Sequence, residues 1–125
     1  MLRRRDYLRV QQGGKRVHAP HFVMIVLPAP RPRLGITVTK RVASAVGRNR
    51  IKRCVREVYR RNRELFPGDC ELVVVARRGA DALGYEAVRA EMAAASPALQ
   101  RAARSARARQ QRPDPHGRDG GEGER

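Results

Sequence analysis

The chain has 125 residues, the length of one domain with a short tail, which leaves little space for a second, cofactor-binding domain. Its 28 Lys and Arg residues outnumber 12 Asp and Glu residues, so its formal net charge is +16. A charge this one-sided predicts a polyanionic partner, either nucleic acid or an anionic membrane surface.

The cysteines and the apolar segments narrow the class of protein further. Cys54 and Cys70 belong to no CxxC pattern and no His cluster accompanies them, so we expect two reduced thiols rather than a zinc site or a disulfide scaffold. The basic residues 3–5 are not followed by the apolar segment of a signal peptide. No segment approaches the roughly 20 apolar residues that span a membrane. We therefore expect a cytoplasmic protein with no membrane partner.

The first third of the chain predicts a short helix and two strands. Residues 2–12 form the helix, which Gly13-Gly14 ends. Residues 22–27 lie between prolines and have the β-branched, apolar character of a buried strand. A second strand covers residues 34–39, and its alternation puts Leu34, Ile36 and Val38 on one face. The short proline-rich link suggests that the two strands pair antiparallel.

The rest of the chain predicts a helix, a strand and a second long helix. Residues 42–46 indicate a brief helical or turn segment, Gly47 interrupts the chain, and a helix follows over about residues 48–64 until Pro67-Gly68-Asp69. The uninterrupted apolar residues 71–76 are typical of a central strand covered on both faces. A last helix covers residues 85 to about 109, and we expect Pro97 to break or kink it.

This order of helix, strands, helix, strand and helix predicts a single-domain α+β sandwich over residues 1–109. Residues 110–125 are rich in Arg, Gly and Pro, and from residue 112 onward they contain no apolar residue apart from Pro113 and Pro115. We predict that they form a disordered tail.

The central helix separates apolar from cationic residues. At about 100° per residue, Ile51, Cys54, Val55 and Val58 share one stripe that is expected to pack on the sheet. The opposite face collects cations and one amide: Asn49, Lys52, Arg53, Arg56, Arg60 and Arg63, with Arg50 and Arg61 at its flank. Glu57 is the single acidic residue between Lys40 and Arg63, so ion pairs within the helix are not expected to neutralise this face.

A solvated helix face is the ordinary alternative, but such a face usually mixes charges of both signs. Uncompensated like charges therefore favour nucleic-acid phosphate as the partner. Lys40 and Arg41 add charge in the preceding loop, and Arg48 opens the helix, whose first N–H groups favour an anion. Asn49 offers an amide for a 2′-hydroxyl, a base edge or a metal-bound water, with helix capping as its alternative role.

The sequence shows no strong candidate for a catalytic site made of protein side chains. His18, His21 and His116 are scattered, and no Asp/Glu cluster suits a pair of metal ions. Asp69 and Glu71 bracket the start of a strand and are weak candidates. The sequence therefore favours binding over chemistry.

Several segments together resemble the protein subunit of bacterial ribonuclease P. The most specific is a strand that ends in Thr39-Lys40-Arg41 and leads to the helix start Arg48-Asn49-Arg50, within residues 35–42, 45–53 and 55–57. In the same order, residues 4–10 resemble the family's first helix, residues 22–23 its next strand, residues 69–77 the strand that ends in Val-Ala-Arg, and residues 85–86 the start of its last helix. The resemblance covers about residues 2–105.

The resemblance implies a fold and a function. The fold is an α+β sandwich of order α-β-β-β-α-β-α, with a small, mostly antiparallel sheet and an unusual left-handed βαβ crossover. The family's enzyme removes the 5′ leader of precursor tRNA by phosphodiester hydrolysis. Catalysis lies in a large RNA subunit with bound Mg²⁺, and the protein assists without a catalytic residue of its own.

The resemblance also implies two binding surfaces. One contacts the catalytic RNA through Lys40, Arg41, Arg48, Asn49, Arg50, Lys52, Arg53, Arg56, Arg60 and Arg61. The other is a cleft for the single-stranded leader, with Tyr7, Arg9 and Phe22 at matching positions. Gln11 and Ile25 stand where the family often has aromatic rings. Packing in the protein is the alternative role for Tyr7, and core burial for Phe22.

Two other functions remain open on the residues alone. A structural RNA-binding protein, such as a ribosomal protein, shares the basic character without the ordered set of segments. A DNA-binding module would place the basic helix in a major groove.

Overall fold

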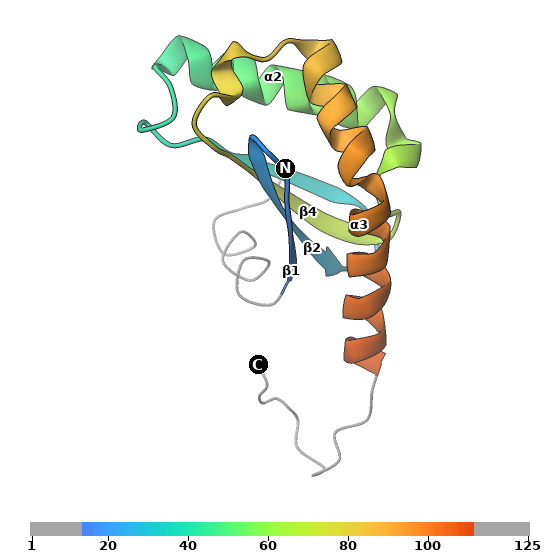
Figure 1. Cartoon of the computed structure of the whole chain (residues 1–125). Helices are drawn as coiled ribbons and strands as arrows, with labels where there is room; N and C mark the ends of the chain where they lie inside the picture. The colour runs from blue at the N-terminus through green and yellow to red at the C-terminus, as the bar shows by residue number, and fades with distance from the viewer. Residues whose placement is uncertain (1–13, 112–125) are drawn as a thin grey trace.

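A four-stranded sheet supports two long helices over residues 14–111, the part of the chain that the computed structural model describes (Figure 1). The strands are β1 (Lys15–His18), β2 (Phe22–Pro28), β3 (Arg33–Thr37) and β4 (Cys70–Ala76), in the spatial order β1-β2-β4-β3. β2 is antiparallel to both β1 and β4, whereas β3 is parallel to β4. The predicted α+β class and the mostly antiparallel sheet are confirmed.

The antiparallel pairing predicted between residues 22–27 and residues 34–39 is wrong, because β4 lies between β2 and β3. Val74 is in register with Met24 of β2 on one side and with Ile36 of β3 on the other. The physical reason has two parts. β4 is buried almost throughout, so it belongs inside the sheet rather than at an edge. The link at residues 28–32 holds three prolines, which restrict the backbone and donate no hydrogen bonds to a tight hairpin.

The parallel neighbours β3 and β4 are joined through α2 (Ala45–Arg61), which makes a βαβ crossover. Its left-handedness stays a prediction. The helix begins earlier than expected: Ser44 is its N-cap, and the Gly47 amide donates to Ser44 Oγ at 3.2 Å. Gly47 thus lies within the first turn rather than before the helix. A Cβ at this position would approach the Ala43 Cβ to 2.9 Å, so the residue permits close packing.

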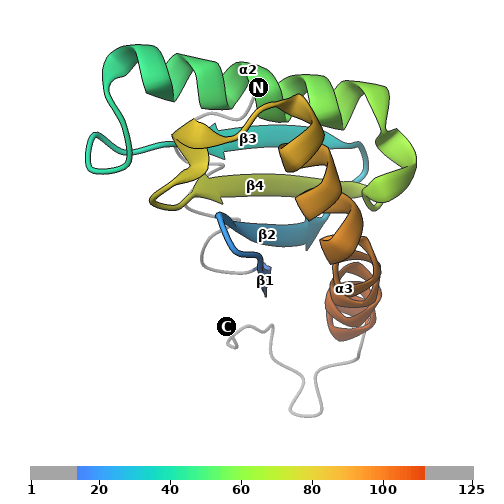
Figure 2. The same ribbon diagram turned by 45° about the horizontal axis from the view of Figure 1, so that its top comes forward.

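The main core fills the space between one face of the sheet and the two helices. Ile51, Val55 and Val58 of α2 are buried there, and Cys54 lies partly buried beside them, as the predicted stripe requires. Leu34, Ile36 and Val38 face the same core, which confirms their shared face. Figure 2 shows α2 along the β3 side of the sheet and α3 crossing the other strands. A second, smaller cluster on the opposite face contains Ile25, Leu27 and Val73.

Helix α3 (Tyr85–Gln111) continues through Pro97, so a break there is wrong, and the alternative of a kink stays a prediction. Buried Ala95 and Leu99 anchor the helix on both sides of the proline. Ser96 Oγ donates to the Leu65 carbonyl at 2.6 Å and adds a further anchor. The helix also includes residues 110 and 111, which were expected in the tail. The predicted helix at residues 2–12 and the tail from residue 112 lie outside the described residues, and the proposed domain boundary stays a prediction.

The C-terminal end of α2 is held by a buried asparagine. The helix ends at Arg61 rather than near residue 64, and Arg63–Leu65 form a short 3₁₀ turn. Asn62 Nδ2 donates to the Val58 carbonyl at 3.0 Å and to Tyr85 Oη at 2.9 Å. Arg89 Nε donates to Asn62 Oδ1 at 3.0 Å. One amide therefore ends α2 and ties it to the start of α3.

Both cysteines are free thiols, Cys54 partly buried and Cys70 buried. Burial raises the pKa of the Cys70 thiol, which keeps it protonated near neutral pH. No helix within residues 14–111 is both long and apolar enough to cross a membrane.

Asn62→Ala should destabilise the protein by about 1–3 kcal/mol, because it removes three hydrogen bonds and leaves buried polar groups without partners. Urea unfolding followed by circular dichroism measures the loss. Asn49→Ala is the matched control, since Asn49 is exposed on the same helix and should change stability by less than about 0.5 kcal/mol. Equal stability of the two variants would contradict the role assigned to Asn62.

Candidate nucleic-acid interface

The packing of α2 turns its cations toward solvent. Because Ile51, Val55 and Val58 are buried against the sheet and α3, the residues on the opposite side of the helix lie outside. Asn49, Arg50, Arg53 and Arg56 are exposed, and Lys52 is partly exposed. Lys40 and Arg41 are exposed in the loop that leads from β3 to the helix. We call these residues the α2 cationic surface: Lys40, Arg41, Asn49, Arg50, Lys52, Arg53 and Arg56.

The charge of this surface is not balanced by other side chains of residues 14–111. Across residues 14–111, no carboxylate lies within ion-pair distance of the six cations of the α2 cationic surface. At the C-terminal end of the helix, the expectation that ion pairs within the helix leave its cations unneutralised does not hold. Glu57 Oε1 lies 2.6 Å from Arg60 Nη2 and 3.3 Å from Arg61 Nε, so these two cations are partly neutralised. The uncompensated charge therefore concentrates over the first three turns and the preceding loop.

The ion pairs with Arg60 and Arg61 affect the pKa of the Glu57 carboxyl. Its hydrogen bond from Arg60 holds the pKa of Glu57 below its ordinary value, with the charges of Arg60 and Arg61 acting in the same direction. A lowered folded-state pKa contributes stability above the unfolded-state pKa, and this contribution is lost as the pH falls through the folded-state pKa. The pair is solvated, so its effect on stability is small and is screened by salt.

Arg48 differs from its neighbours in the Arg48-Asn49-Arg50 segment. It is half-buried, and its Nη1 donates to the Ala43 carbonyl at 3.1 Å. This bond ties the helix to the loop that carries Lys40 and Arg41. Because the helix starts at Ala45, the segment occupies the end of the first turn rather than the helix terminus. The capping alternative for Asn49 is therefore wrong, since Ser44 is the N-cap.

One exposed apolar residue in this region was not predicted from the sequence. Val46 is 80% exposed, the largest exposure of any bulky apolar side chain within residues 14–111. It lies in the first turn of α2, three residues before Asn49 and four before Arg50, so the three side chains share one face. Val46 lies outside the stripe of Ile51, Val55 and Val58, and this position could have indicated its exposure.

Of the three residues predicted for the leader cleft, only Phe22 lies within residues 14–111. Tyr7, Arg9 and Gln11 lie outside the described residues. Phe22 is 0% exposed and faces the main core with Met24 and Val26. Its ring has no face free for a base, so core burial is the role that the structure supports for Phe22. Ile25 lies on the opposite face of the sheet, because neighbouring residues of a strand alternate.

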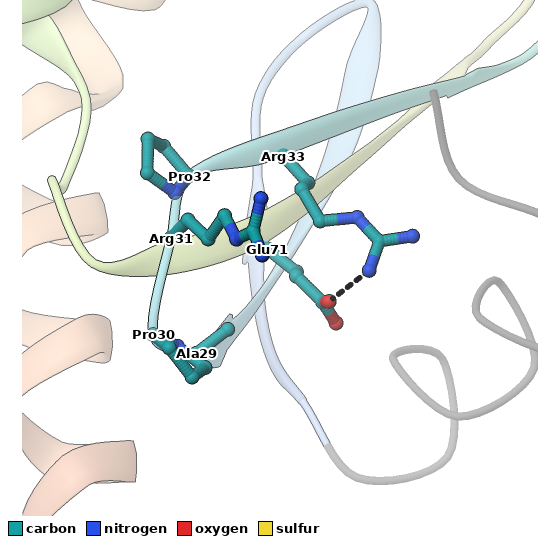
Figure 3. Close-up of a pocket in the computed structure, with 6 residues that line it drawn as sticks. All are labelled: Ala29, Pro30, Arg31, Pro32, Arg33 and Glu71. Atoms are coloured by element: carbon teal, nitrogen blue, oxygen red, sulfur yellow. Dashed lines mark ion pairs between the residues drawn. The ribbon is translucent and has the colours of Figure 1, made fainter.

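The weak catalytic candidates have structural partners. Figure 3 shows a pocket at the turn between β2 and β3, lined by Ala29, Pro30, Arg31, Pro32, Arg33 and Glu71. Glu71 is 3% exposed, and its Oε2 lies 3.2 Å from Arg33 Nη1, which makes it one half of an ion pair. His21 Nδ1 lies 2.9 Å from Glu91 Oε1, and the His21 amide donates to Glu91 Oε2 at 2.6 Å.

Mg²⁺ is expected mainly on the RNA subunit, and a metal site in the protein would need several ligand side chains close together. Within residues 14–111, no three His, Cys, Asp or Glu side chains gather where a metal ion would be held. The described residues therefore do not fit a metal centre made by the protein. What they present is the α2 cationic surface.

Comparisons with known proteins show the family and agree with this fold. The model of the family described as Ribonuclease P matches residues 1–103. The chain is 41% identical over 108 residues to the "Ribonuclease P protein component" of Desulfovibrio desulfuricans, a match that covers 82% of this chain and 81% of the relative. It is 45% identical over 92 residues to the protein of that name from Syntrophobacter fumaroxidans, covering 71% and 77%.

Solved structures give the same result. The ribonuclease P protein of Thermotoga maritima superposes with a TM-score of 0.69 at 32% identity, over 80% of this chain and 94% of the other. The Staphylococcus aureus protein superposes with a TM-score of 0.70 at 25% identity, over 78% and 92%. By sequence and by fold, the chain belongs to the bacterial ribonuclease P protein family.

Proposed function

We propose that this chain is the protein subunit of a ribonuclease P holoenzyme in the cytoplasm. It binds the catalytic RNA and the 5′ leader of precursor tRNA, and it assists the Mg²⁺-dependent endonucleolytic removal of that leader. The observation that carries the proposal is the uncompensated α2 cationic surface on a chain of this family. The name of the relatives, "Ribonuclease P protein component", supports the place of the chain in such an assembly.

The α2 cationic surface is proposed to bind phosphates of the catalytic RNA. Each Lys or Arg that neutralises a phosphate releases a condensed counterion, which drives binding and makes it depend on salt. Arg50, Arg53 and Arg56 present planar guanidinium groups that suit bidentate contacts to phosphate oxygens. Asn49 is exposed between Arg48 and Arg50, so its amide is available to a 2′-hydroxyl or a base edge.

Arg48 is proposed to act differently, through the loop. Its bond to the Ala43 carbonyl holds the segment from β3 to α2 against the helix. That segment carries Lys40 and Arg41, so their positions depend on this bond. Arg60 and Arg61, already paired with Glu57, are weaker candidates for phosphate contacts because an RNA phosphate must compete with the carboxylate.

The division of chemistry follows from the side chains available. Mg²⁺ supplies charge stabilisation and an activated nucleophile in phosphodiester hydrolysis, and we propose that the RNA subunit holds it. The part of the protein at residues 14–111 contributes binding energy and positive charge, with no cluster of metal ligands. For the leader, Tyr7 and Arg9 are the proposed contacts, whereas Phe22 is assigned to the core.

Reconstitution with the catalytic RNA tests the proposal. We expect the protein alone to leave precursor tRNA intact, and the protein with the RNA to cleave it faster at low Mg²⁺ than the RNA alone does. Cleavage products resolved on a denaturing gel measure the rate. RNA binding without any change in cleavage would instead indicate a structural RNA-binding protein, and preference for duplex DNA in competition would indicate a DNA-binding module.

Arg50→Gln should weaken binding to the catalytic RNA. Loss of one phosphate contact should lower the slope of log K against log salt by about 0.7–0.9. Filter binding over a series of salt concentrations measures the slope. Arg31→Gln is the control, because Arg31 is an exposed cation on the turn between β2 and β3 and not on α2. The same slope for Arg50→Gln and the unmodified protein would remove Arg50 from the interface.

Tyr7→Ala should weaken binding of leader-bearing tRNA by roughly 1–3 kcal/mol if the ring stacks on a base. Mature tRNA, which lacks the leader, should bind the variant as well as it binds the unmodified protein. Holoenzyme affinities for the two tRNAs give the comparison. An equal loss for both substrates would show that Tyr7 does not contact the leader.

A further inference from the structure

The C-terminal half of α3 carries a second group of cations, remote from α2. Arg101 and Arg104 are exposed, while Leu99, Ala103 and Ala106 on the other side of the helix are buried. No acidic residue occurs between Glu91 and Asp114 in the sequence. Across residues 14–111, no carboxylate lies within ion-pair distance of Arg101 or Arg104. This part of α3 therefore presents uncompensated positive charge, as α2 does.

The packing of α3 makes this surface a fixed one. Three buried residues hold residues 99–106 on the body of the protein, and Arg107 Nη2 donates to the Asp69 carbonyl at 3.4 Å. Arg107 is thus turned toward the start of β4, whereas Arg101 and Arg104 point away from the core. The helix continues to Gln111, beyond residue 103 where the family match ends. Arg104 and the last turns of α3 are an addition to the matched family segment.

A favourable interaction with the helix dipole is the simplest alternative reason for these arginines. Cations near a helix C-terminus are stabilised by that dipole, but the effect is limited to about the last turn. Arg101 lies ten residues before Gln111 and Arg104 lies seven before it, so both are outside that range. The dipole explains a cation in the last turn of α3 and leaves Arg101 and Arg104 unexplained.

The position of the surface separates it from α2. Figure 1 shows the C-terminal half of α3 extending away from α2 at the far end of the molecule, and Figure 2 shows the same from a second direction. Arg101 lies sixteen residues after Tyr85, which is about 24 Å along the helix at 1.5 Å per residue. This exceeds the Debye length of about 8 Å at physiological salt, so salt largely screens Arg101 from charges at the junction of α2 and α3.

The composition of the surface indicates what it binds. No Phe, Tyr or Trp follows Tyr85 in the sequence, so the C-terminal half of α3 offers no aromatic ring on which an unpaired base would stack. Paired RNA is recognised mainly through its shape and its backbone, for which cations on a rigid helix suffice. A partner that reaches α2 and the end of α3 together must also be long enough to span that separation.

We infer that Arg101 and Arg104 of α3 form a second RNA-contact surface, which binds the phosphate backbone of a paired segment of the catalytic RNA. The inference rests on the proposed function, because it assumes that the catalytic RNA is the partner of α2. It adds a second anchor at the other end of the protein, partly outside the matched family segment. The two anchors together would fix the orientation of the protein on the RNA, which a single surface leaves free to rotate.

The test is the full-length double variant Arg101→Gln/Arg104→Gln, bound to the catalytic RNA over a series of salt concentrations. Loss of two phosphate contacts should lower the slope of log K against log salt by about 1.4–1.8. Arg101→Lys/Arg104→Lys keeps the charge and should retain most of the slope. Ser105→Gln/Ala108→Gln changes two exposed residues of the same helix without changing the charge, and it should bind as the unmodified protein does. Circular dichroism checks that each variant is folded.

The outcomes distinguish a failure of the second RNA-contact surface from a failure of the proposed function. An unchanged slope for Arg101→Gln/Arg104→Gln, with a lowered slope for Arg50→Gln, would overturn the second anchor and leave the proposed function intact. If the protein neither binds the catalytic RNA nor accelerates cleavage, the proposed function itself fails. A slope that falls for precursor tRNA binding to the protein alone, and not for the catalytic RNA, would overturn the assignment to the catalytic RNA. Lowered slopes for both Arg50→Gln and the α3 variant with the catalytic RNA support two anchors.

Discussion

The burial of Ile51, Val55 and Val58 against the sheet and α3 decides the direction of every cation on α2. Fully burying one such side chain contributes about 1.5–3 kcal/mol, several times the cost of a repulsive pair of like charges on a helix. The apolar stripe therefore holds the helix in place while its other face accumulates uncompensated charge. Repulsion on that face is a local cost, which a polyanion bound to the surface would remove.

The core that receives this stripe depends on β4. Because β4 is buried along nearly its whole length, it occupies the interior of the sheet, between β2 and β3. The proline-rich turn after β2 then has to pass β4 before β3 can begin, and α2 has to return the chain from β3 to β4. The cationic loop at Lys40 and Arg41 lies at the start of this return. Its place beside α2 thus follows from the strand order and from the bond between Arg48 and Ala43.

Asn62 and α3 complete the frame that presents the charged surfaces. Asn62 ends α2 and connects it to Tyr85 and Arg89, so the end of α2 and the start of α3 are fixed relative to each other. From that junction α3 crosses the sheet, and its C-terminal half extends to the far end of the molecule (Figure 1). Arg101 and Arg104 belong to this half of the helix. The buried amide and the apolar side of α3 together set the geometry between the two groups of cations.

The sequence by itself determined the α+β class, the polycationic character of the chain, and the division of α2 into an apolar stripe and a cationic face. These features depend on composition and on local periodicity, which are properties of the chain before it folds. It also determined the family, through residues in one order along the chain. It did not determine that β4 separates β2 from β3, because strand pairing depends on which residues far apart in sequence bury each other best.

Only the tertiary structure decided the roles of several single residues. Phe22 was a candidate for the leader cleft until the sheet placed its ring in the main core, opposite the face of Ile25. Asn62 has no distinguishing pattern in the sequence, since its three hydrogen bonds join residues up to 27 positions apart. Pro97 predicts a break by local rules, yet burial of Ala95 and Leu99 keeps α3 continuous. For Pro97, long-range packing outweighed the local preference of proline to interrupt a helix. For Phe22 and Asn62, the deciding contacts come from residues far away in the sequence.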